Sequence, residues 1–144
     1  MLPSAPPPSR TCLRRPRILL VDDDPGVIRA LWRLLRQARP DLVVNTASST
    51  AQALQALSEH SYDIVLTDLQ MPGGGGRSVL RAFKQSSPET ARIVHSSQPE
   101  SPDTSVGEDA HVILAKPASE DEILEAIEQS LARVSREGRP SCCG

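Results

Sequence analysis

Aromatic residues and cysteines are scarce in this chain of 144 residues. Aromatics make up 2% of the sequence, which leaves no stacking platform on which nucleic-acid bases could bind. The cysteines are odd in number and lie outside the expected core, so a structural disulfide framework is not expected. The aromatics are Trp32, Tyr62 and Phe83, and the cysteines are Cys12, Cys142 and Cys143.

The sequence also lacks a long apolar run. No stretch approaches the roughly 20 apolar residues that a membrane-spanning helix needs. The first residues, MLPSAPPPSRTCLRRPR, contain no apolar segment of the kind that a secretory signal requires. We therefore expect a cytoplasmic protein with no membrane span.

Charge is unevenly distributed along the chain. The formal net charge is -2, but residues 18–132 carry nine basic against seventeen acidic residues, whereas both ends are basic. An acidic body argues against a nucleic-acid-binding face on the domain and suits a divalent cation or a basic partner. We expect residues 1–16 and 135–144 to be disordered tails around one domain, residues 17–134.

Apolar runs typical of buried strands alternate with amphipathic helical patterns. Asp24 and Pro25 predict a helix start, as do Ser119 and Glu122 with capping-box spacing. The second helix is expected to turn Leu54 and Leu57 inward. Strands are predicted at 17–22, 42–47, 64–67, 92–96 and 111–114, and helices at 25–38, 49–59, 77–85 and 119–134.

This alternation predicts a doubly wound α/β fold, in which helices cover both faces of a five-stranded parallel sheet. Residues 98–109, QPESPDTSVGED, contain two prolines and little apolar periodicity. A fourth helix in this segment is therefore expected to be short, displaced or absent.

Polar residues stand where the predicted strands end. Ligands of open parallel sheets bind outside the carboxyl ends of the strands, so these residues are candidates for a shared site. Crowded carboxylates repel one another unless a cation lies among them, and Mg²⁺ accepts carboxylate and carbonyl oxygens. The residues at the strand ends are Asp22, Asp23, Asp24, Asp68, Ser96 and Lys116.

The segments ILLVDDDP, IVLTDLQMP and ILAKP resemble, in this order, the signature segments of bacterial response-regulator receiver domains. The resemblance covers residues 17–134 and implies the flavodoxin-like strand order 2-1-3-4-5. It implies Asp68 as the phosphoacceptor and Asp22 and Asp23 as an acidic pair that positions Mg²⁺. The carbonyl of Gln70 would be a further metal ligand.

The resemblance also implies how the phosphoryl group is held. Ser96 matches the hydroxyl residue that binds it, and Lys116 matches the lysine of the family's pocket, followed by a cis peptide to Pro117. Because strand boundaries are uncertain by a residue, Ser97 is the alternative to Ser96. A glycine matching Gly76 shapes the loop before the third helix in this family, and Gly73–Gly76 are otherwise a flexible connector.

Other readings apply to several of these residues. Asp24 before Pro25 is interpreted as a helix N-cap rather than a ligand. His95 and His111 are interpreted as core or edge side chains, because no second histidine or cysteine has metal-ligand spacing. Cys142 and Cys143 could be acylated or bind metal, but they are interpreted as incidental exposed thiols.

Two departures from the family pattern concern signal output. Ile113 stands three residues before the lysine, where many receivers carry an aromatic that changes rotamer on phosphorylation. The irregular segment 98–109 replaces much of a helix that forms part of the family's partner surface. RIVHSSQPE and AHVILAKP further resemble receivers that precede HDOD or HD-type output domains.

We expect a stand-alone receiver, monomeric or weakly dimeric, and the resemblance implies that a histidine kinase or phosphotransfer protein phosphorylates it. Such a protein is a switch, not an enzyme, beyond its self-catalysed phosphoryl transfer and slow autodephosphorylation. One alternative is a pseudo-receiver, a phosphorylation-independent interaction module. A metal-dependent phosphatase is disfavoured, since Gln70 stands where a second carboxylate would be needed.

Overall fold

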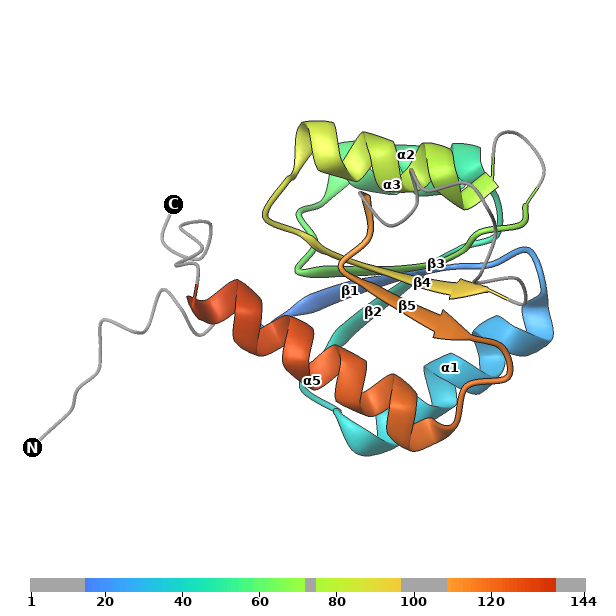
Figure 1. Ribbon diagram of the computed structural model, residues 1–144, viewed down its shortest axis with the longest axis vertical. Helices are drawn as coiled ribbons and strands as arrows, with labels where there is room; N and C mark the ends of the chain where they lie inside the picture. The colour runs from blue at the N-terminus through green and yellow to red at the C-terminus, as the bar shows by residue number, and fades with distance from the viewer. Residues whose placement is uncertain (1–14, 72–74, 97–108, 137–144) are drawn as a thin grey trace, which may run out of the picture.

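The computed structural model describes residues 15–71, 75–96 and 109–136, and Figure 1 shows a sheet between two pairs of helices. The strands are β1 (Arg17–Val21), β2 (Val43–Ala47), β3 (Ile64–Asp68), β4 (Ala91–Ser96) and β5 (Val112–Ala115). The helices are α1 (Pro25–Ala38), α2 (Thr50–Glu59), α3 (Gly75–Ser86) and α5 (Glu120–Arg136).

All strands are parallel, and their order is β2-β1-β3-β4-β5. This confirms the predicted fold class and strand order. Strand ends differ from the predicted ones by one residue, so that Asp68 is the last residue of β3 and not the first residue after it.

Alternate residues of the strands face two different helix layers. Ile18 and Leu20 of β1 pack with α1 and α5, whereas Leu19 and Val21 pack with α2 and α3. Successive strand residues point to opposite faces, which explains why a continuous apolar run is needed where both faces are covered. The pairing of α1 with α5, and of α2 with α3, is visible in Figure 1.

Helix starts agree with the expected capping residues. Asp24 caps α1 and accepts a hydrogen bond from the Gly26 N–H at 2.8 Å. At α5, the Glu122 N–H donates to Ser119 Oγ at 3.1 Å, and the Ser119 N–H donates to Glu122 Oε1 at 2.8 Å. The predicted cap and capping box are confirmed.

The inward face of α2 was predicted wrongly at one position. Leu54 is 38% exposed, whereas Ala53 is fully buried. Ala53, Ala56 and Leu57 share the stripe that meets the core, with spacings of three and four residues. Leu54 lies about 100° around the helix from Ala53, which turns it toward solvent.

Several expectations fall outside the described residues. These are the fourth-helix segment up to residue 108, residues 1–14 and 137–144 of the expected tails, Ser97, and Gly73 and Gly74. Helix α5 continues to Arg136, two residues past the expected domain boundary. In the described part of the chain, no helix is both long and apolar enough to cross a membrane.

Candidate functional site at the carboxyl end of the sheet

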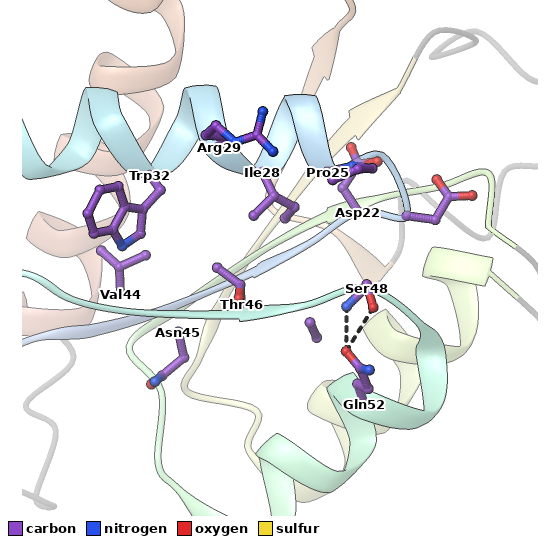
Figure 2. Close-up of a pocket in the computed structure, with 12 residues that line it drawn as sticks. Asp22, Pro25, Ile28, Arg29, Trp32, Val44, Asn45, Thr46, Ser48 and Gln52 are labelled. Atoms are coloured by element: carbon purple, nitrogen blue, oxygen red, sulfur yellow. Dashed lines mark hydrogen bonds between the residues drawn. The ribbon is translucent and has the colours of Figure 1, made fainter.

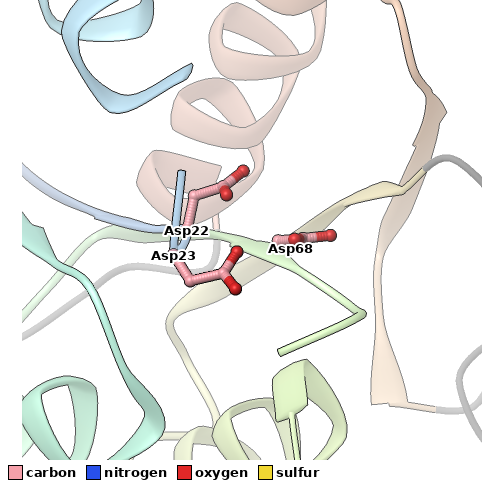
Figure 3. Close-up of side chains that lie close together, drawn as sticks. All are labelled: Asp22, Asp23 and Asp68. Carbon is pink, nitrogen blue, oxygen red and sulfur yellow. The ribbon is translucent and has the colours of Figure 1, made fainter. Parts of the chain in front are cut away.

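Three aspartates meet where β1 and β3 end side by side. The register pairs Val21 with Thr67, so Asp22 and Asp23 follow β1 at the level at which β3 reaches Asp68. Each offers a carboxylate oxygen within 4.8 Å of the others. Figure 3 shows the three side chains together at this edge. The juxtaposition expected from the strand ends is therefore present.

Lys116, which follows β5, is the cation of this cluster. Its Nζ donates to Asp22 Oδ2 at 3.0 Å and lies 3.6 Å from Asp68 Oδ2. The side chain of Asp22 is 3% exposed and that of Asp68 is 7% exposed. The peptide bond to Pro117 is cis, as the resemblance implied.

Backbone N–H groups complete the surroundings of the two buried carboxylates. The Asp24 N–H donates to Asp22 Oδ1 at 2.9 Å, and the Gln70 N–H donates to Asp68 Oδ1 at 3.3 Å. These bonds fix the orientation of each carboxylate and leave Asp23 exposed at the rim.

The cluster carries more negative than positive charge. Three carboxylates face one ammonium, and burial raises the pKa of Asp68 above its ordinary value. The charge of Lys116 lowers this pKa, whereas Asp22 and, more weakly, Asp23 raise it. Like charges and burial both disfavour ionised Asp68, so an additional cation would stabilise the ionised form.

The donor set suits Mg²⁺. Carboxylate oxygens are hard ligands, and Mg²⁺ is usually held by one or two of them together with waters and phosphate oxygens. Asp23 and Asp68 each retain a carboxylate oxygen that accepts no hydrogen bond from the described residues, and the excess of two negative charges matches one divalent ion.

Replacing Asp68 by asparagine is expected to stabilise the protein at pH 7 in EDTA, by about 1 kcal/mol. The folded state binds the Asp68 proton more tightly than the unfolded chain does, since the pKa is raised from 3.8. Wild-type stability therefore falls as pH rises from 3.8 through the raised pKa, whereas Asp68→Asn escapes this loss. Urea unfolding across pH 3 to 8 measures both curves.

Glu125→Gln is the matched control, because Glu125 is an exposed acid of α5 away from the cluster. It should leave the free energy of unfolding within about 0.5 kcal/mol of wild type. An Asp68→Asn protein less stable than wild type at pH 7 in EDTA would contradict the repulsion argument.

Ser96 is the last residue of β4 and is fully buried. Its hydroxyl donates to Gln70 Oε1 at 3.3 Å, which brings the ends of β3 and β4 together. The Lys116 N–H donates to the Ser96 carbonyl oxygen at 2.8 Å. Ser96 thus adjoins the cluster, while its alternative, Ser97, lies outside the described residues.

Ile113 lies in β5 and is 39% exposed. An aliphatic side chain on the outermost strand has no ring or hydroxyl with which to follow a change at Ser96. That the rotamer switch of the family is missing or altered at this position stays a prediction.

His95, near the carboxyl end of β4, and His111, which precedes β5, differ in their surroundings. His111 accepts a hydrogen bond from the Arg92 N–H at 3.0 Å through Nδ1. His95 is 6% exposed, and neither of its ring nitrogens has a hydrogen-bond partner among the described residues. Their interpretation as core or edge side chains agrees with this burial, but the sequence carried no sign that His95 would lack partners.

A groove of about 960 Å³ leads away from the acidic edge, between α1 and β2. Figure 2 shows Asp22 at one end and Trp32 at the other, with Arg29 between them on α1. Arg36 stacks on Trp32 with its guanidinium carbon 5.1 Å from the ring centroid. The sequence did not predict this groove, because it depends on how α1 packs beside β2 in three dimensions.

Comparisons with known proteins agree on one family. The family model described as "Response regulator receiver domain" matches residues 18–128. The transcriptional regulatory protein GlrR of Escherichia coli is 31% identical over 116 residues, which cover 79% of this chain and 26% of that protein. The chain thus spans about a quarter of the length of such curated relatives.

Solved structures are similar over most of the chain. The signal receiver domain of an HD domain-containing protein from Pseudomonas fluorescens Pf-5 has a TM-score of 0.76 and 29% identity, covering 86% of this chain and 92% of that one. The response regulator TrrA from Thermotoga maritima, solved with Mg²⁺ and BeF, has a TM-score of 0.74 and 25% identity, covering 81% and 99%.

Proposed function

The chain belongs to the response-regulator receiver family, and from this membership we propose that it is a phosphorylation switch with Asp68 as its phosphoacceptor. Receiver domains are signalling switches that interact with histidine kinases or phosphotransfer proteins. The proposed donor is therefore a phosphohistidine of such a partner.

The observation that carries the proposal is the position of the Asp68 carboxylate. It ends β3 within reach of Asp22, Asp23 and Lys116, in a cluster that lacks the positive charge to balance its three acids. A bound divalent cation would relieve this imbalance without losing an acid, and such a cation can in turn take phosphoryl oxygens as ligands. A structural role alone would not require three carboxylates here.

The proposed reaction is an in-line displacement at phosphorus. An ionised Asp68 oxygen attacks the phosphorus atom, an O–P bond forms, and the P–N bond to the donor histidine breaks with its electron pair left on nitrogen. Bound Mg²⁺ would neutralise charge on the phosphoryl oxygens. Asp22, Asp23 and the carbonyl of Gln70 are the proposed ligands besides Asp68.

Two further residues have proposed roles in holding the product. Lys116 is positioned to move its ammonium from the Asp68 carboxylate, 3.6 Å away, to a phosphoryl oxygen. The Ser96 hydroxyl would exchange its bond with Gln70 for one to the same group. These exchanges would shift the loops after β3 and β4 and so alter partner binding. Slow hydrolysis by water would reset the switch.

The second candidate is a pseudo-receiver that binds partners without phosphorylation. The exposed aliphatic Ile113 favours it, because this position offers no aromatic that could report the state of the site. The cluster at Asp68 opposes it, since a module without switch chemistry gains nothing from crowded acids.

Intact mass spectrometry decides between the two candidates. Incubation with acetyl phosphate and Mg²⁺ is expected to add one phosphoryl group to the wild-type chain. The gain should vanish in EDTA and in Asp68→Asn, because each removes a required part of the reaction.

Asp109→Asn serves as a matched control, because Asp109 is a buried acid paired with Lys84 outside the cluster. It should be labelled like the wild type. An unlabelled wild type, under conditions in which an ordinary receiver is labelled, would favour the pseudo-receiver. Labelling of Asp68→Asn would place the phosphoacceptor elsewhere.

A further inference from the structure

A second cavity, of about 290 Å³, lies between α1 and the turn that leads from β5 into α5. Val27, Leu31 and Leu34 of α1 line one side, and Ala118 and Ile123 line another. This face of the sheet is opposite to the one covered by α2 and α3 (Figure 1). Ala118, in the turn between β5 and α5, has a small side chain and therefore leaves this space beside α1 open.

His95 lines this cavity from β4. Its strand neighbours alternate, so that Ile93 packs with α1 and α5 whereas Val94 packs with Leu80 of α3. His95 shares the parity of Ile93 and therefore faces the same side. At 6% exposure it is a buried polar group, and neither Nδ1 nor Nε2 has a partner in the described part of the chain.

A buried, unpaired imidazole is costly, because each buried donor or acceptor left without a partner loses about 1–3 kcal/mol relative to solvation. Burial and the charge of Lys116 lower the pKa of His95, while Asp22 opposes them. A neutral imidazole carries one N–H donor and one nitrogen acceptor. The cavity thus combines apolar walls with one unsatisfied hydrogen-bonding pair, the usual character of a small-molecule site.

We propose that this cavity binds a small uncharged molecule that has an apolar body and one hydroxyl or carboxamide group bonded to His95. The size suits a single ring, since a cavity of about 150 Å³ accommodates benzene. The walls are mostly apolar and carry no excess of either charge, so they would not compensate the desolvation of an ion. Lys116 and Glu120, of opposite charge, also line the cavity, but Lys116 is already paired with Asp22 and Asp68.

The site is distinct from the proposed phosphorylation site but shares Lys116 with it. An occupant would contact the residue that holds Asp22 and Asp68. Binding itself does not depend on phosphorylation, so the test of this proposal is independent of the phosphoacceptor assignment.

Phenol is a suitable probe, and toluene is its apolar counterpart without a hydroxyl. Titration followed by NMR is expected to show saturable shifts of the His95 ring and of the Leu31 and Ile123 methyl groups. Phenol should bind about threefold to tenfold more tightly than toluene, the range that one net hydrogen bond supports. His95→Phe should abolish this difference while retaining toluene binding.

Ala118→Leu fills the cavity and should weaken both probes at least tenfold. Ala38→Leu is the matched control, because Ala38 is exposed at the end of the same helix α1 and does not line the cavity; it should change neither affinity. Absence of saturable shifts near His95 would overturn the proposal. So would equal phenol and toluene affinities, or binding that Ala118→Leu leaves intact, and these two results are decisive even if His95→Phe fails to fold.

Discussion

Lys116→Met is expected to slow phosphorylation of the chain by acetyl phosphate about 10-fold to 100-fold, within the scale seen when one electrostatic contact to a transition state is removed. The ammonium of Lys116 lies 3.0 Å from Asp22 and 3.6 Å from Asp68. Among the described residues, it is the only Lys or Arg that forms an ion pair with the cluster. Methionine retains the length of the apolar stem and removes the charge.

The same substitution should tighten Mg²⁺ binding, because the ammonium and the metal compete for the same carboxylates. Slower labelling combined with tighter metal binding separates loss of a specific charge from general damage to the site. Labelling rates come from a mass-spectrometric time course, and metal affinity comes from calorimetry.

Lys84→Met is a matched control, since Lys84 is the only other lysine of the chain. It pairs with Asp109 at 3.1 Å, away from the acidic cluster. Its labelling rate and Mg²⁺ affinity should match wild type. If Lys116→Met were labelled at the wild-type rate with Mg²⁺ present, the role proposed for Lys116 would be wrong.

Gly76→Ala is expected to destabilise the fold by about 3 kcal/mol or more, or to prevent folding, as overpacking against rigid backbone does. A Cβ at Gly76 would lie 2.1 Å from the Asp68 carbonyl oxygen and 2.9 Å from the Leu69 Cα. Both atoms belong to the backbone that carries the candidate phosphoacceptor. The Gly76 N–H also donates to the Leu69 carbonyl oxygen at 3.0 Å, which holds α3 close to the end of β3.

Urea unfolding followed by circular dichroism measures this loss. Gly26→Ala is the control, because its Cβ would meet only the Asp24 Oδ1 side-chain atom, at 3.2 Å, at the exposed start of α1. Its free energy of unfolding should stay within about 1 kcal/mol of wild type. A Gly76→Ala protein of wild-type stability would mean that β3 and α3 separate easily, which the close approach argues against.

Strand and helix types could be predicted from the sequence because they depend on local patterns. Apolar runs such as IVLT, bounded by polar strand ends, specify strands buried on both faces. Asp24 before Pro25 and Ser119 with Glu122 specify helix starts through bonds that span only two or three residues. The exposed Leu54 shows the limit of such patterns, since the phase of a helix against its sheet is set by packing.

Membership of the receiver family also followed from the sequence, since three strand-end segments agree with one topology. The residues that end the predicted strands also indicated which side chains, namely aspartates, a serine and a lysine, would be at the candidate site. Their roles remain proposals that the labelling experiment tests.

Only the tertiary structure decided which groups meet and at what distance. The cluster joins residues 22, 23, 68 and 116, and the pairing of Lys116 with both Asp22 and Asp68 requires β1, β3 and β5 to end at one level. The cavity at His95 and the approach of Gly76 to Asp68 depend likewise on how helices pack on the sheet. Local sequence determines backbone conformation through short-range sterics and hydrogen bonds, whereas these contacts arise from the close packing of segments distant in the chain.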